Sequence, residues 1–325
     1  MTTISPKENL IRAISRCNPE YVPIRRMNGQ IDGMETVIYR GAWPPSNGID
    51  RWNVTWNGGF PARCEWEPEQ LSYATHHPIS DLSQLDEYEF PDPSEPGLTD
   101  GLLDGIDRDQ VLISGRIQSC LFERALSLVG MENLLIAVLD QQDRVRSLLQ
   151  RIADYQIVIV QRYLCLGVDN IRATDDYGGQ DRLLISPKLW RSLIKPELAR
   201  IVKAVKDGGA AFWLHSCGHI MEIIPDLVEI GVDILDPIQS RANDLVKIKQ
   251  LYGQDLSFMG GIDTQQLLLL GNPEMIAQEV KKQIELMAPG GGFILGPENI
   301  IAVPEINYRA YIKAGKRFGK YPILG

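Results

Sequence analysis

From about residue 110 to the C-terminus, short apolar runs alternate with longer stretches in which apolar residues recur every three or four positions. The runs predict strands, and the periodic stretches predict helices. Apolar strands separated by helices are typical of a parallel sheet that helices cover. Predicted strands begin at Val111, Val168, Ala210, Val232, Leu256 and Phe293, and predicted helices cover 120–129, 131–139, 142–165, 220–230, 241–251, 273–287 and about 304–317, with one more starting at Ser186.

The N-terminal third is less regular. Residues 5–8 (Ser-Pro-Lys-Glu) form a helix start, because Ser is a good N-cap, Pro suits the first helical position and Glu completes a capping box. This helix is predicted to run to about Arg16. Short strands are predicted at 21–24 and 51–56, which brings the predicted strands to eight.

Eight strands in a βα rhythm favour an α/β fold, a (β/α)8 TIM-like barrel with an elaborated N-terminal segment. Residues 1–325 are then expected to form a single barrel domain. Its N-terminal helix, loops and lid would occupy 1–105, and the regular βα repeats would occupy 106–325. A doubly wound open sheet is the alternative, but no GxGxxG motif follows the first strand, so nothing indicates a dinucleotide-binding fold.

Composition and charge narrow the function classes. With 44 % apolar and 23 % charged residues, the 325-residue chain has the composition of a globular protein. The formal net charge of −9 argues against a general nucleic-acid surface and against a basic membrane-binding patch. Five well-separated cysteines without a CxxC pair, and an N-terminus without an apolar signal core, predict a cytoplasmic protein.

Polar residues follow the predicted strands. His215 and Cys217 stand at i and i+2 at the end of a strand, where both side chains point the same way. Imidazole and thiolate are both good zinc ligands, and one carboxylate would complete a site with three protein ligands. Carboxylates expected at the same mouth of the barrel are Asp175, Asp176, Asp236, Asp263 and Glu298.

Each of these residues also has a simpler interpretation. Asp263 is better explained as a helix cap, and Glu298 taken alone as a solvated loop charge. Cys217 taken alone is more often a small buried apolar residue, and His215 a hydrogen-bonded core histidine. Together, and directly before Gly218, these two residues favour a pair of metal ligands.

Several motifs in the same order resemble the uroporphyrinogen decarboxylase superfamily. The resemblance covers nearly all of the chain from about residue 105, and it implies a distorted (β/α)8 barrel with its cleft at the strand ends. The motifs are Leu121–Ala125, Gly130–Leu134, Asp175–Gln180, Ile185–Trp190, His215–Gly218, Gly231–Pro237 and Gly260–Thr264.

This superfamily has two branches. True decarboxylases resemble one another in an arginine-rich segment reading like MRQAGRY, whereas residues 24–30 here read IRRMNGQ and lack the arginines after Met. The other branch comprises cobalamin-dependent methyltransferases with an HxC motif and a late Cys. His215 and Cys217 match the first two ligands, and the loop 296–299 replaces the late Cys, so Glu298 is expected as the third ligand.

The resemblance therefore implies a zinc-dependent methyltransferase of the O-demethylase type. It would move methyl from a small methoxylated substrate, expected to be aromatic, to the cobalamin of a separate corrinoid protein, because the chain has no DxHxxG corrinoid segment. Asp176 and Asp236 are expected to orient substrate or ligands, while Trp52, Trp56 and Tyr177 would line the pocket.

Three other functions stay open. The enzyme could transfer methyl from methylcobalamin to a thiol or to tetrahydrofolate, it could be a uroporphyrinogen decarboxylase, or the cleft could be a non-catalytic tetrapyrrole-binding module. No nucleic-acid or membrane partner is expected, and a homodimer is one possible assembly.

Overall fold

The computed structural model describes residues 4–42, 48–58 and 73–323. Its main sheet has seven parallel strands in the order β1-β5-β6-β7-β8-β9-β10. Every strand from β6 onward except β7 is buried along its whole length, as expected for a sheet covered by helices. The strands are β1 (Met34–Ile38), β5 (Leu112–Ile117), β6 (Asn170–Thr174), β7 (Ala211–His215), β8 (Ile234–Ile238), β9 (Ser257–Ile262) and β10 (Phe293–Pro297).

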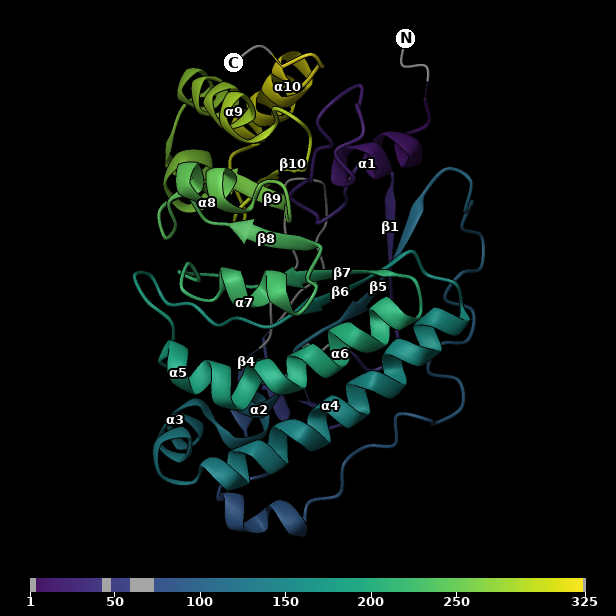
Figure 1. The fold of residues 1–325 in the computed structure, drawn as a ribbon, viewed down its shortest axis with the longest axis vertical. Coiled ribbons are helices and arrows are strands. Elements are labelled where there is room, and N and C mark those ends of the chain that lie inside the picture. Colours follow the sequence, from purple (N-terminus) through teal and green to yellow (C-terminus); the bar gives the residue numbers. More distant parts are fainter. Residues whose placement is uncertain (1–3, 43–47, 59–72, 324–325) are drawn as a thin grey trace.

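Helices follow the strands and lie on the outside of the sheet, with α4 and α6 side by side (Figure 1). Among the described residues, no helix is both long enough and apolar enough to cross a membrane. The helices are α1 (Pro6–Ile14), η1 (Leu82–Asp86), α2 (Phe122–Val129), α3 (Met131–Asp140), α4 (Gln142–Cys165), α5 (Pro187–Leu189), η2 (Trp190–Ile194), α6 (Lys195–Asp207), α7 (Ile224–Glu229), α8 (Leu245–Tyr252), η3 (Thr264–Leu268), α9 (Pro273–Met287) and α10 (Glu305–Phe318).

The eighth strand position is filled by a short segment rather than by a full strand. Ile24 forms a single parallel bridge with Leu295 of β10. The Leu295 N–H donates to Pro23 O (2.9 Å), and the Arg25 N–H donates to Leu295 O (2.8 Å). The predicted strand at 21–24 is therefore present in this reduced form, and the predicted fold class, a distorted α/β barrel, is confirmed.

The second predicted strand, 51–56, was placed wrongly. Only Thr55–Asn57 (β3) is extended, and it belongs to a separate antiparallel sheet with β2 (Gly48–Ile49) and β4 (Tyr73–His76). The residues before β3 form a turn because the Asp50 carboxylate accepts hydrogen bonds from the N–H groups of Trp52 and Val54. The barrel strand that takes this place in the sheet is β1.

Candidate metal centre

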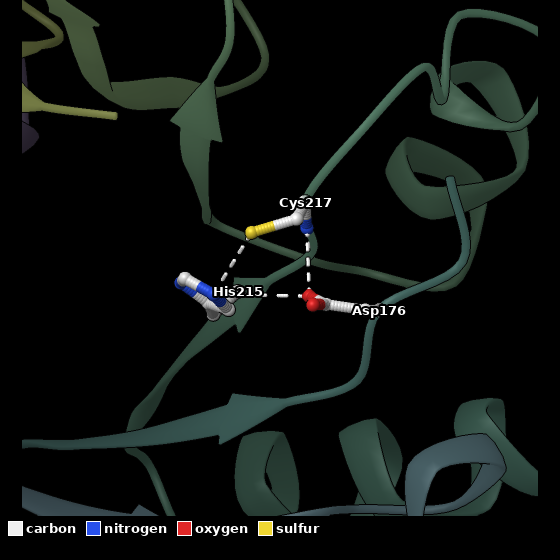
Figure 2. Close-up of side chains that lie close together, drawn as sticks. All are labelled: Asp176, His215 and Cys217. Carbon is white, nitrogen blue, oxygen red and sulfur yellow. Dashed lines mark hydrogen bonds and ion pairs between the residues drawn. The ribbon is translucent and has the colours of Figure 1, made fainter. Parts of the chain in front are cut away.

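Three side chains from two neighbouring strand ends meet at the mouth of the barrel (Figure 2). Asp176 follows β6, His215 ends β7 and Cys217 lies two residues further on. The Cys217 Sγ is 3.6 Å from His215 Nε2, which is 3.7 Å from Asp176 Oδ1. One ligand atom from each residue lies within 4.8 Å of the other two, so the three form a group able to hold a metal ion. We call them the triad.

Asp236 orients the histidine of the triad. Its Oδ2 lies 3.2 Å from His215 Nδ1, which leaves Nε2 facing Cys217. The same buried carboxylate accepts a hydrogen bond from Trp213 Nε1 (2.7 Å) and forms an ion pair with Arg172. Although burial acts to raise the pKa of Asp236, the charges of Arg172 and His215 lower this pKa below its usual value. A carboxylate behind the ligating histidine is a common feature of metal sites.

The chemistry of the triad fits zinc, which accepts imidazole, thiolate and carboxylate ligands. Burial raises the pKa of the Cys217 thiol, and the carboxylates of Asp176 and Asp236 add to this effect. A divalent cation between these groups has the opposite effect, because it stabilises the thiolate directly. The acidic side chains that disfavour a free thiolate are therefore the ones that would favour the cation.

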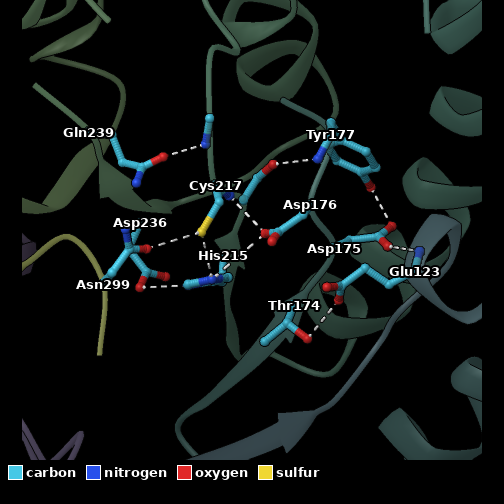
Figure 3. A network of polar contacts seen from close by, with 12 residues as sticks. Glu123, Thr174, Asp175, Asp176, Tyr177, His215, Cys217, Asp236, Gln239 and Asn299 are labelled. Atoms are coloured by element: carbon cyan, nitrogen blue, oxygen red, sulfur yellow. Dashed lines mark hydrogen bonds and ion pairs between the residues drawn. The ribbon is translucent and has the colours of Figure 1, made fainter. Parts of the chain in front are cut away.

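Backbone hydrogen bonds hold together the two loops that carry the triad (Figure 3). The Cys217 N–H donates to Asp176 Oδ1 (2.8 Å), so the carboxylate is fixed to the same turn as the thiol. A ladder of main-chain bonds continues on both sides of this contact. Its members are Asp175 N–H to His215 O (2.9 Å), Gly178 N–H to Cys217 O (3.2 Å) and His219 N–H to Gly179 O (2.7 Å).

This ladder requires glycine at position 218. Gly218 has φ +81°, and a Cβ there would lie 2.2 Å from the carbonyl oxygen of Gly178. We expect Gly218→Ala to separate the two loops, to lower stability by roughly 1–3 kcal/mol and to weaken zinc binding, as measured by urea unfolding and metal titration. Gly209→Ala is the control, because Gly209 has φ +79° with nothing within 4 Å of its Cβ position. Equal zinc affinity in both variants would contradict the prediction.

Asp175 and Tyr177 are part of the packing behind the triad. The Asp175 carboxylate accepts hydrogen bonds from the N–H groups of Leu121, Phe122 and Glu123 at the start of α2. It also accepts the Tyr177 hydroxyl hydrogen bond (2.6 Å). Complete burial raises the pKa of Asp175 to about 6, although these hydrogen bonds act in the opposite direction. Tyr177, predicted to contact substrate, is buried, with its hydroxyl turned toward Asp175.

Glu123 is a residue of this site that the sequence did not single out. Its carboxylate accepts a hydrogen bond from Thr174 Oγ1 (3.1 Å) and faces the triad from the start of α2 (Figure 3). Burial raises the pKa of Glu123 well above its usual value, and the charges of Asp176 and Asp175 add to this. The available signal was its place in the Leu121–Ala125 motif, where a Glu in the first helical turn resembles an ordinary N-terminal charge.

Glu298 lies in the mouth but does not belong to the triad. Directly after β10, its Oε1 accepts a hydrogen bond from the Ser240 N–H (2.7 Å), and the side chain is buried. The neighbouring Asn299 faces the triad instead, with Oδ1 3.9 Å from Cys217 Sγ. Asp176, rather than Glu298, is thus the carboxylate grouped with His215 and Cys217 in this geometry.

We expect Glu298 to make stability depend on pH. Burial raises its pKa from 4.5 to about 7, with a smaller contribution from Asp263. A raised carboxyl pKa gives stability that is present below about pH 4.5 and lost as the pH rises to 7, because the unfolded chain releases the proton first. Glu298→Gln lacks this loss, so its stability relative to wild type should rise by up to about 3 kcal/mol between pH 4.5 and 8.

Urea unfolding of both proteins across this pH range measures the effect. Glu89→Gln is the matched control, because Glu89 is exposed. A constant difference between Glu298→Gln and wild type at every pH would contradict the prediction.

The two tryptophans expected in the pocket pack elsewhere. The Trp52 ring is buried, 4.4 Å between centroids from Tyr155, and the Arg124 guanidinium lies over it. Trp56 Nε1 donates to the Asp50 carboxylate (2.8 Å). Neither ring lines the described cavity beside the turn at Cys217. Asp263 caps η3, as expected, by accepting hydrogen bonds from two backbone N–H groups.

Comparisons with known proteins show which proteins this chain resembles. The uroporphyrinogen decarboxylase (URO-D) family model matches residues 64–318. A methylated-thiol–coenzyme M methyltransferase from Methanosarcina mazei is 22 % identical over 202 residues, which are 60 % of this chain and 50 % of that protein. The chain thus spans about half the length of this curated relative. A solved methyltransferase structure from Methanosarcina mazei has a TM-score of 0.73 at 18 % identity, covering 97 % of this chain and 99 % of that one.

Proposed function

The chain belongs to the uroporphyrinogen decarboxylase (URO-D) family, and we propose that it is a zinc-dependent methyltransferase of the O-demethylase type. It would move a methyl group from a small methoxylated substrate to the cobalt of a separate corrinoid protein. The convergence of Asp176, His215 and Cys217 carries the proposal, because it places one oxygen, one nitrogen and one sulfur ligand together at the mouth of the barrel. The similarity to two methyltransferases supports it.

The triad residues would hold the zinc, while other groups keep the triad in place. Bound zinc supplies a Lewis acid that polarises the ether oxygen of the substrate. Asp236 keeps His215 oriented through Nδ1, and the Cys217 N–H keeps Asp176 beside the thiol. As methyl transfers, the C–O bond would break with both of its electrons staying on oxygen, and the electron pair of the partner's cobalt(I) would form the new cobalt–carbon bond. The oxygen would then take a proton from water and become a hydroxyl group.

The choice of an ether substrate rests on the composition of the triad. Only one of its three ligands is a thiolate, and carboxylate oxygen is a harder ligand than sulfur. A zinc ion with fewer thiolates withdraws more electron density from a substrate oxygen, which suits the activation of an ether. Activation of a thiol nucleophile favours a thiolate-rich, more electron-donating site.

The description of the curated relative favours a second candidate. That protein acts on methylated thiols and coenzyme M, so this chain could instead transfer methyl from methylcobalamin to a thiol. The same triad would then bind the thiol sulfur. The two candidates differ in the direction of methyl transfer and in the atom that is activated, so one assay separates them.

The test uses protein purified without chelator and loaded with zinc. Reduced free cob(I)alamin is mixed with a panel of methoxylated compounds, and formation of methylcobalamin is followed by absorbance. The reverse assay supplies methylcobalamin and a thiol. We expect methylcobalamin to form from at least one methoxylated donor. Efficient thiol methylation without any demethylation would establish the second candidate, and absence of both reactions would reject the proposal.

A further inference from the structure

A polar cavity of about 300 Å³ lies beside the turn at Cys217, although no triad residue lines it. Gln239 and Asn299 belong to its wall and also contact the turn at Cys217: the Gly218 N–H donates to Gln239 Oε1, and Asn299 Oδ1 faces the thiol. Figure 3 shows both side chains beside Cys217, on the side away from Asp176. A larger cavity of about 810 Å³ includes Met34 and Val111, near the opposite ends of the strands, and no triad residue lines it.

Amide groups free to bind a ligand dominate the wall of the smaller cavity. Within the described part of the chain, no hydrogen bond engages the side-chain amides of Gln180 and Gln265. The NH2 groups of Gln239 and Asn299 are likewise without a partner there, because only the oxygen of each amide is in contact. Each of these four amides can donate hydrogen bonds, and those of Gln180 and Gln265 also offer a free carbonyl oxygen. The wall therefore suits a ligand with several donors and acceptors.

The charged residues of the wall are mostly engaged with one another. Asp263 accepts hydrogen bonds from two backbone N–H groups, and its second oxygen lies 3.4 Å from Arg241. Glu298 uses one oxygen for the Ser240 N–H. Burial raises its pKa to about 7, so near neutral pH this carboxyl group exchanges between a donor and an acceptor of hydrogen bonds. Arg241 and Asp263 thus compensate each other's charge, and Glu298 is the remaining ionisable group of the wall.

The residue types that line the cavity also indicate the class of substrate. The described residues that line the cavity include no aromatic side chain, so no flat apolar surface is present for a benzene ring. An aromatic ether would offer few hydrogen-bond partners to these amides. A hydroxylated aliphatic molecule would pair with them.

We propose, resting on the methyltransferase function above, that this cavity binds the methyl donor and that the donor is a methoxylated polyol or sugar rather than an aromatic ether. Its hydroxyl groups hydrogen-bond to Gln180, Gln265 and Glu298. Its methoxy group lies next to Asn299, whose Oδ1 is 3.9 Å from Cys217 Sγ. A cavity of about 300 Å³ has room for a molecule of monosaccharide size.

Isothermal titration calorimetry on the zinc-loaded protein tests the site. The probes are a panel of mono-O-methyl hexoses and mono-O-methyl inositols, with 2-methoxyphenol for comparison. We expect at least one methylated polyol to bind more tightly than 2-methoxyphenol. Gln180→Leu and Gln265→Leu should each weaken its binding at least about tenfold, because each removes hydrogen-bonding groups from a polar wall. Gln254→Leu, a change at an exposed residue outside the wall, should leave binding unchanged.

The outcomes separate this proposal from the proposed function. If 2-methoxyphenol is demethylated with cob(I)alamin and no methylated polyol binds, the substrate class is wrong while the methyltransferase function stands. If a polyol binds through Gln180 and Gln265 but no donor gives methylcobalamin, the polyol site is supported and the proposed reaction is overturned. Equal loss of affinity in Gln254→Leu, with unchanged melting temperatures of all three variants, would reject this cavity as the site.

Discussion

We expect His215→Ala to lose zinc binding and, with it, the proposed methyl transfer to cobalamin. The imidazole belongs to one of only three triad residues, and its Nε2 lies 3.6 Å from Cys217 Sγ and 3.7 Å from Asp176 Oδ1. Because changes in the groups behind a metal ligand already cost about 10–100-fold in affinity, we expect removal of the ligand itself to cost at least 100-fold. Zinc content after purification without chelator, and competition with a chelating dye, measure the loss.

His219 provides a matched control four residues away. Its Nδ1 lies 2.6 Å from Ala242 O, its Nε2 is 2.9 Å from the Glu222 carboxylate, and it does not belong to the triad. His219→Ala should therefore keep one zinc ion and most of the activity. A His215→Ala protein that retains one equivalent of zinc with wild-type affinity would show that the metal, if bound, is held elsewhere.

The regular part of the fold was predictable because local and tertiary preferences agree there. The helix predicted at 142–165 has the same bounds as α4, and the one at 273–287 matches α9. Strands such as β9 and β10 are buried along their whole length, so each is a mostly apolar run bounded by turns. The same reasoning placed His215 and Cys217 at the barrel mouth, because strand ends of a parallel barrel converge there.

Strand β1 was missed for the opposite reason. Its buried residues Met34 and Val37 are separated by exposed Glu35 and Thr36, so the segment has neither a continuous apolar run nor a strict alternation. Arg51–Trp56 alternates better but is stopped by the Asp50 turn, which a pattern of hydrophobicity does not encode. Local periodicity does not predict a strand correctly where pairing with a distant strand decides the structure. For β1 this distant strand is β5.

The sequence also could not identify which carboxylate lies beside His215 and Cys217. Asp175, Asp176 and Glu298 all follow strands. The hydrophobic pattern of the sequence therefore predicts the same position, at the mouth of the barrel, for each of them. Three-dimensional contacts separate them: Asp175 is bound to the N-terminus of α2, and Glu298 to the Ser240 N–H. Only Asp176 is tied to the turn that carries the thiol. Which carboxylate reaches the centre therefore depends on hydrogen bonds between loops that are far apart in the sequence.

Asp236→Asn should be the most destabilising of the changes considered. Asp236 is fully buried and forms an ion pair with the equally buried Arg172, and Arg25 also contributes to its low pKa. Removing the negative charge leaves the guanidinium charges uncompensated inside the barrel, which costs about 3–5 kcal/mol. Zinc affinity should fall about 10–100-fold as well, because His215 loses its charged hydrogen-bond partner. Urea unfolding and zinc titration at pH 7 measure the two effects.

The pH dependence and a double variant distinguish a lost charge pair from a general packing defect. A lowered carboxyl pKa gives stability that is present above the unfolded pKa and lost as the pH falls, so the difference between wild type and Asp236→Asn should shrink below about pH 4. Adding Arg172→Met to Asp236→Asn removes one uncompensated charge and should recover much of the stability. It should not restore zinc affinity, because His215 still lacks its carboxylate. If the double variant recovered both stability and zinc affinity, or recovered neither, Asp236 would not act as a separate orienting group for the triad.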